Sequence, residues 1–148
     1  MISESAEYLF QSESVSISGF RCPPGDPRWA TDNLITLGSQ IVFPWTSVRI
    51  KHQGGRGFVA DSNQVMFYNN HQVYTRSCLT EYGDRALCVH FDDSVLVDAV
   101  RAYDPSVAER PQRPFAFAYG PCSPHNYLRQ HLLHRELVDG HGVNAIPS

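Results

Sequence analysis

The feature that most constrains the fold is a series of short apolar–polar alternations between residues 15 and 91, separated by turn-forming residues. Segment 15–19 alternates apolar residues or glycine with serines, and segment 48–52 alternates basic residues with Val48, Ile50 and His52. A period of two is typical of β-strands that bury one face. Six or seven such strands with turns at regular spacing predict a β-sandwich or a small barrel.

Turn signals divide this region into hairpins. Residues 53–57 contain three glycines, and residues 61–63 form a second polar turn. A third turn is centred on Gly83 and Asp84, which predicts that the strands on either side of it pair with each other. Segment 64–68 is apolar on both sides, so we expect it deep in the sheet.

The pattern changes to helical spacing after residue 92. Asp92 and Asp93 suit the N-terminus of a first helix, and capping explains this carboxylate pair better than acid–base chemistry does. A second helix is predicted from Ser123 as N-cap and Pro124 as the first helical residue. We therefore expect a mainly β fold followed by two C-terminal α-helices. The expected division is a flexible N-terminus over 1–12, a β domain over 13–92, a helical region over 93–138 and a flexible tail over 139–148.

Size and charge restrict the class of protein. With 148 residues, the chain is long enough for one domain with a real core. Its formal charge is −3, from 12 Lys and Arg against 15 Asp and Glu, and the basic residues form no stripe. Direct binding of DNA by this chain is therefore not expected. Without an apolar run of membrane-spanning length or a secretory signal, we expect a cytoplasmic protein and no membrane partner.

Catalytic motifs do not stand out in the sequence. His52, His71, His90 and His125 occur singly, without the H-x-H or H-E-x-x-H spacing of metal sites. There is also no nucleophile elbow, P-loop or dinucleotide-binding motif. His131 and His134 lie one turn apart on the last predicted helix, where an exposed face is a simpler interpretation than a metal clamp. We expect no enzymatic activity and assign no catalytic residue.

The middle of the chain resembles a known family. Residues 41–91, "IVFPWTSVRIKHQGGRGFVADSNQVMFYNNHQVYTRSCLTEYGDRALCVHF", are similar to the N-terminal, cupin-like sensor domain of AraC-family transcriptional regulators. Order and spacing agree together over roughly residues 19–91. The resemblance is carried by Arg21-Cys22, Val42-Phe43-Pro44, Gly54-Gly55, the run 60–69, Tyr74, Gly83-Asp84 and Cys88.

The resemblance implies a cupin-like β-barrel or sandwich that senses a small-molecule effector. It also implies a homodimer, with the helical region serving dimerisation and the link to a C-terminal DNA-binding domain that this chain does not contain. DNA would then be a partner only through that missing domain. The alternatives are a stand-alone cupin-like metal-dependent enzyme and a small-molecule binding protein.

Two sets of residues are candidates for these roles, although each member is also a plausible core residue. The ligand-pocket candidates are aromatic and apolar residues of the predicted strands: Phe43, Trp45, Phe58, Met66, Tyr68 and Tyr74. The dimer-helix candidates form a broad apolar stripe on the last helix: Tyr127, Leu128, Leu132, Leu133 and Leu137.

The cysteines allow a zinc site. If Gly83 is the centre of a hairpin, Cys78 faces Cys88, and His90 lies on the same side of the sheet. With Cys22 these residues would form a Cys3His set. A register slip of one residue would separate them. The same residues are also compatible with a redox disulfide or with buried thiols, so zinc is the single cofactor considered.

Overall fold

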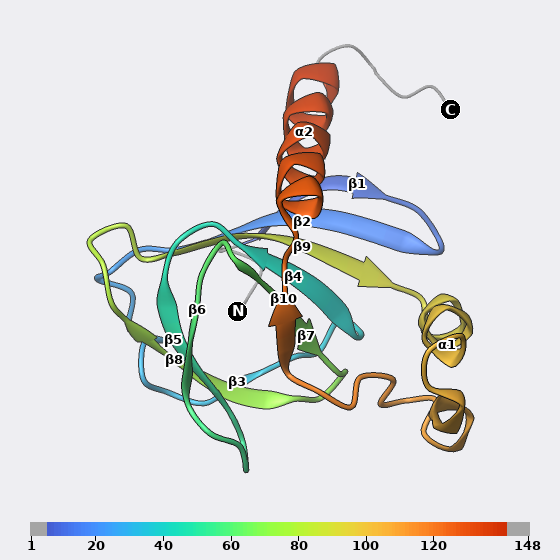
Figure 1. The fold of residues 1–148 in the computed structure, drawn as a ribbon. Coiled ribbons are helices and arrows are strands. Elements are labelled where there is room, and N and C mark those ends of the chain that lie inside the picture. The colour runs from blue at the N-terminus through green and yellow to red at the C-terminus, as the bar shows by residue number, and fades with distance from the viewer. Residues whose placement is uncertain (1–5, 142–148) are drawn as a thin grey trace.

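The computed structural model describes residues 6–141 (Figure 1). The strands are β1 (Ala6–Gln11), β2 (Val15–Cys22), β3 (Asn33–Leu34), β4 (Gln40–Pro44), β5 (Val48–His52), β6 (Phe58–Ala60), β7 (Gln64–Tyr68), β8 (Val73–Cys78), β9 (Asp84–Phe91) and β10 (Tyr119–Pro121). The helices are α1 (Asp93–Arg101), the short 3₁₀ helix η2 (Pro105–Glu109) and α2 (Pro124–His141).

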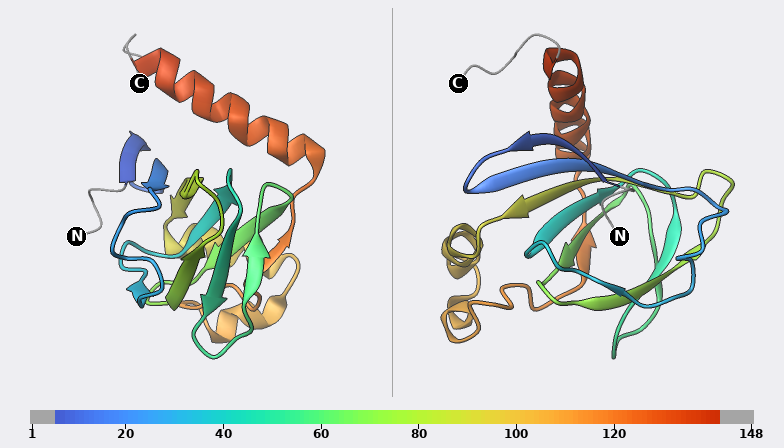
Figure 2. Two further views of the ribbon diagram at one scale, coloured as in Figure 1. Left: turned by 90° about the vertical axis from the view of Figure 1, so that its left-hand side faces the viewer. Right: turned by 180° about the vertical axis from the view of Figure 1, so that it is seen from behind.

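The strands form two antiparallel sheets that face each other (Figures 1 and 2). One sheet has the order β1-β2-β9-β4-β7-β10, and the other has the order β3-β8-β5-β6. This mainly β, cupin-like architecture with two C-terminal α-helices confirms the predicted fold class. None of the helices in the described part of the chain is long and apolar enough to cross a membrane.

The six-stranded sheet has apolar residues on both faces. Along β9, Ala86 and Cys88 belong to the cluster between the two sheets. Leu87 and Val89 alternate with them and belong to a second cluster on the opposite face. Successive side chains of a strand point to opposite faces, so β9 contributes to both clusters. We call these two surfaces of the six-stranded sheet its inner and outer faces.

Helix α2 packs against the outer face. Its Leu137 packs against the cluster that contains Leu9 and Ile17, and the helix contacts β1. The helix begins at Pro124, as predicted, and Ser123 accepts a hydrogen bond at its Oγ from the Asn126 backbone N–H at 3.1 Å. Figure 2 shows α2 lying above the strands and leaving them towards the C-terminus.

Two predicted flexible segments need correction. Residues 6–11 of the expected flexible segment 1–12 form β1, which pairs with β2 and inserts Leu9 into the outer cluster. The expected flexible tail 139–148 begins inside a helix, since α2 extends to His141. Residues 1–5 and 142–148 lie outside the described part of the chain.

The predicted hairpin around Gly83 is also wrong. Strand β8 lies in the four-stranded sheet, and β9 lies in the six-stranded sheet between β2 and β4. Gly83 has a φ of +68°, and a Cβ built on it would lie 2.3 Å from the Cys22 carbonyl oxygen. The turn does require glycine, as the sequence predicts. It does not join two paired strands, because the chain crosses at this point from one sheet to the other.

Candidate functional site

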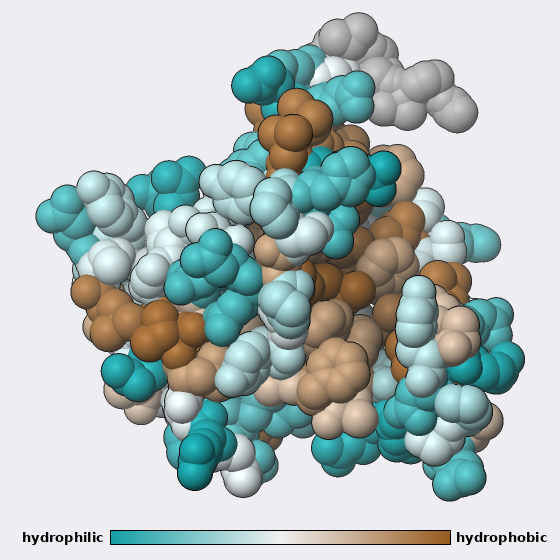
Figure 3. All heavy atoms as spheres, viewed as in Figure 1, coloured by the Kyte–Doolittle hydropathy of each residue, from teal (hydrophilic) through white to brown (hydrophobic). Residues whose placement is uncertain are grey.

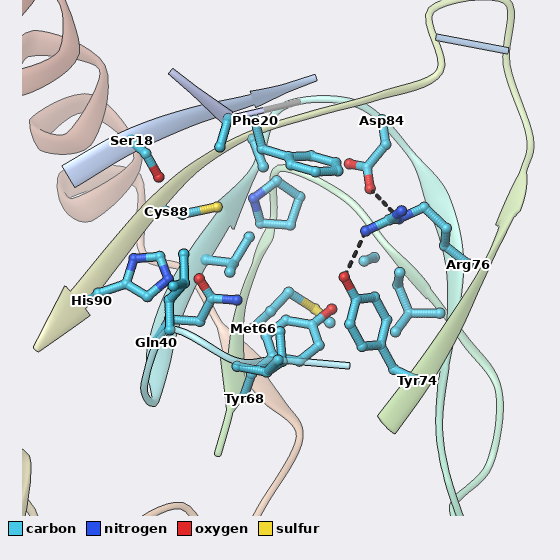
Figure 4. Close-up of a pocket in the computed structure, with 18 of the residues that line it drawn as sticks. Ser18, Phe20, Gln40, Met66, Tyr68, Tyr74, Arg76, Asp84, Cys88 and His90 are labelled. Atoms are coloured by element: carbon cyan, nitrogen blue, oxygen red, sulfur yellow. Dashed lines mark hydrogen bonds and ion pairs between the residues drawn. The ribbon is translucent and has the colours of Figure 1, made fainter. Parts of the chain in front are cut away.

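Side chains from both sheets enclose a cavity of about 130 Å³. Alternate residues of β9 point into it, among them Asp84, Cys88 and His90, and Arg76 enters from β8 in the facing sheet. Figure 4 shows Arg76, Asp84 and Tyr74 at one end of the cavity and His90 with Gln40 at the other. The cavity therefore has two polar ends.

The first polar end is a buried ion pair. Arg76 Nε lies 3.0 Å from Asp84 Oδ2, and Arg76 Nη2 donates a hydrogen bond to the Tyr74 hydroxyl at 2.6 Å. The guanidinium also lies over the Phe20 ring, 4.7 Å from its centroid. Arg76 is only 4% exposed, yet its Nη1 has no hydrogen-bond partner among the described residues. The two N–H groups of Nη1 are thus left as donors to another molecule.

Burial is the main cause of the pKa shifts at this end of the cavity. It raises the pKa of Asp84, although the charge of Arg76 opposes the shift. Burial also raises the pKa of Tyr74. It raises the pKa of Tyr68 well above the usual value of a phenol. Both tyrosines are therefore neutral hydroxyls at pH 7.

The second polar end contains uncharged groups. The side chains of Gln40 and Ser18 are buried and make no side-chain hydrogen bond to another residue in the described part of the chain. His90 Nδ1 is buried without a partner, and desolvation lowers the pKa of this histidine. Burial raises the pKa of Cys88 to about 12, so its thiol stays protonated.

The walls between the two ends are apolar. Ile50 and Val48 enter from the four-stranded sheet, and Val42 and Met66 enter from the six-stranded sheet. Met66 is 1% exposed. A mainly apolar cavity with a few fixed polar groups is the usual form of a small-molecule site.

On the outer face, Trp45 connects the end of β4 to α2. Its Nε1 donates a hydrogen bond to Gln130 Oε1 at 2.9 Å. Its ring stacks on His131 with centroids 4.7 Å apart and meets the edge of His134 at 4.6 Å. The preceding residue, Pro44, lines the cavity on the inner face. One peptide bond therefore separates a residue of the cavity wall from a residue that contacts α2.

The structure divides the predicted ligand-pocket residues between several places. Met66, Tyr68 and Tyr74 line the cavity. Phe58 packs against the inner cluster, where its ring stacks on Tyr119, but it does not line the cavity. Phe43 of β4 and Trp45 just after it pack against the outer cluster instead, because they alternate along the chain with Val42 and Pro44, which line the cavity.

The four zinc candidates are not gathered as expected. Cys78 pairs with Val48 in the four-stranded sheet, whereas Cys88 pairs with Ser18 and Val42 in the other sheet. The expected pairing of Cys78 with Cys88 is therefore wrong. Cys78 is exposed, Cys22 is fully buried, and Cys88 and His90 line the cavity. Within residues 6–141, no group of three or more His, Cys, Asp or Glu side chains is arranged to hold a metal ion.

The predicted dimer helix corresponds to α2. Leu137 is half-buried against the outer cluster. The other four members of the stripe are exposed on the isolated chain: Tyr127, Leu128, Leu132 and Leu133. Figure 3 shows apolar atoms of α2 at the surface.

The charged pair in the cavity was not among the predicted site residues. Arg76 belongs to a strand recognised in the sequence, and Asp84 to a recognised turn, but nothing local shows that they meet. The sequence offers one signal for this contact, the alternation of side chains along a strand. Tyr74, Arg76 and Cys78 share one face of their strand, and Asp84, Ala86 and Cys88 share one face of theirs. If both faces point into the protein, the single charged residue on each of them indicates a buried ion pair.

Fold and cavity together define a cupin-like β domain that holds a pocket between its sheets and carries a helix on one of them. No protein-family model and no curated protein match the sequence. The structure of ToxT from Vibrio cholerae is similar, with a TM-score of 0.56 and 10% identity over 82% of this chain and 47% of ToxT. This likeness supports the cupin-like fold, and the chain spans about half the length of ToxT.

Two further structures are similar over smaller parts of the chain. An RmlC-like cupin family protein from Methanocaldococcus jannaschii has a TM-score of 0.47 and 9% identity over 58% of this chain and 77% of its own. HppE with Fe(II) and substrate has a TM-score of 0.48 and 16% identity over 60% of this chain and 53% of its own.

Proposed function

We propose that this chain is an effector-sensing domain of a transcription regulator, in which a small molecule bound between the sheets changes the position of α2. The likeness to ToxT, an AraC-family protein, agrees with this proposal at the level of the fold. In this role the domain binds and signals, and it does not catalyse a reaction. A DNA-binding domain of the regulator would receive the signal.

The observation that carries the proposal is the arrangement around β4. Pro44 lines the cavity, and Trp45 directly after it holds α2 by a hydrogen bond to Gln130 and a stacked contact with His131. A ligand that displaces the end of β4 changes the contact with the helix. A bound molecule shifts the balance of two arrangements if it binds one of them more tightly.

A second connection runs through β7. Met66 and Tyr68 of this strand line the cavity, and Met66 pairs with Tyr119 of β10. Strand β10 ends at Pro121, three residues before α2 begins. Trp45, which contacts the middle of α2, follows a cavity-lining residue, and β10, which leads into α2, pairs with a strand that lines the cavity.

We propose that α2 also serves as the dimer contact. Four apolar residues of the helix are exposed, including Leu128 at 56% and Leu132 at 49%. Leu128 and Leu132 lie one turn apart on the same side of the helix, and this exposed pair favours a second copy of the chain, because self-association removes apolar surface from water. Sedimentation measurements should give a dimer for the native chain and a monomer for the Leu128→Glu/Leu132→Glu variant, whose thermal stability should be retained.

Trp45 supplies a direct test of the sensing mechanism. The chain has two tryptophans, so Trp29→Phe leaves Trp45 as the reporter of the α2 contact. This variant is screened against a library of small metabolites for compounds that raise the melting temperature. We expect such compounds to change Trp45 emission as well.

The matched control is Ala86→Leu, which adds side-chain volume at a cavity-lining position. Both the thermal shift and the emission change should disappear in this variant. Compounds that bind in the cavity and leave Trp45 emission unchanged would contradict the sensor and support a small-molecule binding protein instead.

A further inference from the structure

We infer that the cavity takes an uncharged, largely apolar molecule about the size of one aromatic ring, with a hydrogen-bond acceptor directed at Arg76. This inference rests on the proposed function, since it names the class of effector that the same site would bind. Charge, size and polar contacts support it separately.

The cavity carries no net charge. Among the described residues that line the cavity, Arg76 and Asp84 are the charged side chains, and they neutralise each other at 3.0 Å. The other titratable groups of the wall, such as Tyr68, Cys88 and His90, are held neutral by burial. A charged ligand would therefore be buried without a counter-charge, which is strongly unfavourable.

The cavity is the size of a small ligand. A volume of about 130 Å³ is close to that of cavities known to hold benzene, which measure about 150 Å³. Aromatic and aliphatic side chains, including Phe20 and Met66, form the middle of the wall. A polyhydroxylated molecule of this size would lose more hydrogen bonds to water than these walls replace.

Polar groups at the two ends of the cavity can fix the orientation of a ligand. Asp84 forms an ion pair at Nε of Arg76, and the Tyr74 hydroxyl accepts a hydrogen bond from Nη2. These contacts hold the guanidinium in place, while Nη1 is left as a donor to an acceptor on the ligand. At the opposite end, Gln40 offers both a donor and an acceptor. A ring with one carbonyl, amide or hydroxyl substituent fits this pattern.

Matched single-ring probes test the inference on the native chain by calorimetry at pH 7. The probes are benzamide, benzyl alcohol, benzoate and benzylammonium, which differ chiefly in charge. We expect the two neutral probes to bind at least about tenfold more tightly than either ion, a difference of about 1.4 kcal/mol. Equal or tighter binding of benzoate or benzylammonium would overturn the inference and leave the cavity as a ligand site.

The Asp84→Asn variant should reverse the preference of the cavity for neutral probes over anionic ones. Removing the carboxylate leaves the charge of Arg76 uncompensated, so benzoate should then bind more tightly than benzamide. An unchanged preference for benzamide in folded Asp84→Asn protein would overturn the inference. The comparison of probes on the native chain does not depend on whether this variant folds.

The cavity-filling variant separates the two proposals. Neutral probes should bind the native chain and not Ala86→Leu. If no probe binds the native chain more tightly than this variant at millimolar concentration, the cavity is not a ligand site, and the proposed function fails together with the inference.

Discussion

The two faces of the six-stranded sheet differ in what they bury. The inner face surrounds a cavity with a charged pair and several unpaired polar groups. The outer face is closed by an apolar cluster of Leu9, Ile17, Leu87 and Val89 and by α2. Because one set of strands builds both faces, a single sheet separates the cavity from the helix. Under the proposed function, the inner face binds the effector and the outer face passes the change on to α2.

The largest expected effect comes from breaking the ion pair of the inner face. Arg76→Met leaves Asp84 buried without its partner and should lower the free energy of unfolding by about 3–5 kcal/mol, measured by urea denaturation. The double variant Arg76→Met/Asp84→Leu should recover most of this loss. If the single variant is as stable as the native chain, the pair is not buried as described.

The outer face should respond to the loss of apolar volume. Leu87 is fully buried, so Leu87→Ala should cost about 2–5 kcal/mol of unfolding free energy in the same assay. Ligand preference in the folded protein should not change, because Leu87 points away from the cavity. A switch in the preferred probe would show that the two faces are not separate.

Acid should weaken the contact between Trp45 and α2. Desolvation, assisted by the nearby His134, lowers the pKa of His131 in the folded chain. In acid, the folded state therefore binds fewer protons at His131 than the unfolded state does. The contribution of neutral His131 to the stability of the folded chain is fully present above the ordinary histidine pKa of about 6.5 and is lost as pH falls below it.

The measurement is Trp45 emission in Trp29→Phe protein between pH 8 and pH 5. His52 and His90 carry pKa shifts of the same sign, so global stability alone would not isolate His131. We expect an emission change on acidification that becomes smaller in the His131→Gln variant. An identical pH response in that variant would assign the change to another group.

The smallest expected effect is at Cys78. This residue is exposed at the end of β8 and lies in the sheet opposite Cys88. Cys78→Ser should change the unfolding free energy by less than about 0.5 kcal/mol. Metal analysis of the native and variant proteins tests the zinc prediction directly, and zinc that is present in the native chain and lost in Cys78→Ser would require a different arrangement of β8.

Local sequence patterns predicted the strands and helices better than they predicted which strands pair with each other. The alternation of residues 48–52 and the capping residues before Pro124 are set by neighbours in sequence, and both elements form as predicted. The segment that forms β1 has a weak apolar pattern, and its structure depends on pairing with β2 and burial of Leu9. Such tertiary stabilisation is not visible in the segment itself.

The site was predictable only in part for the same reason. Tyr68 and Tyr74 follow from an expectation of aromatic side chains in the barrel. Phe43 and Trp45 look equivalent to them in the sequence, but the face of β4 on which they lie depends on the pairing of β4 with β7 and β9. Arg76 and Asp84 come from different sheets, and their contact depends on the crossover at Gly83.

The central claim is that occupancy of the inner face changes the helix on the outer face. Hydrogen–deuterium exchange of α2, measured with and without a saturating cavity ligand, tests it most directly. We predict altered exchange in α2 of the native chain and no alteration in the Trp45→Leu variant, which binds the ligand but lacks the contact. Exchange that changes only in β4, β7 and β9 of the native chain would contradict the claim.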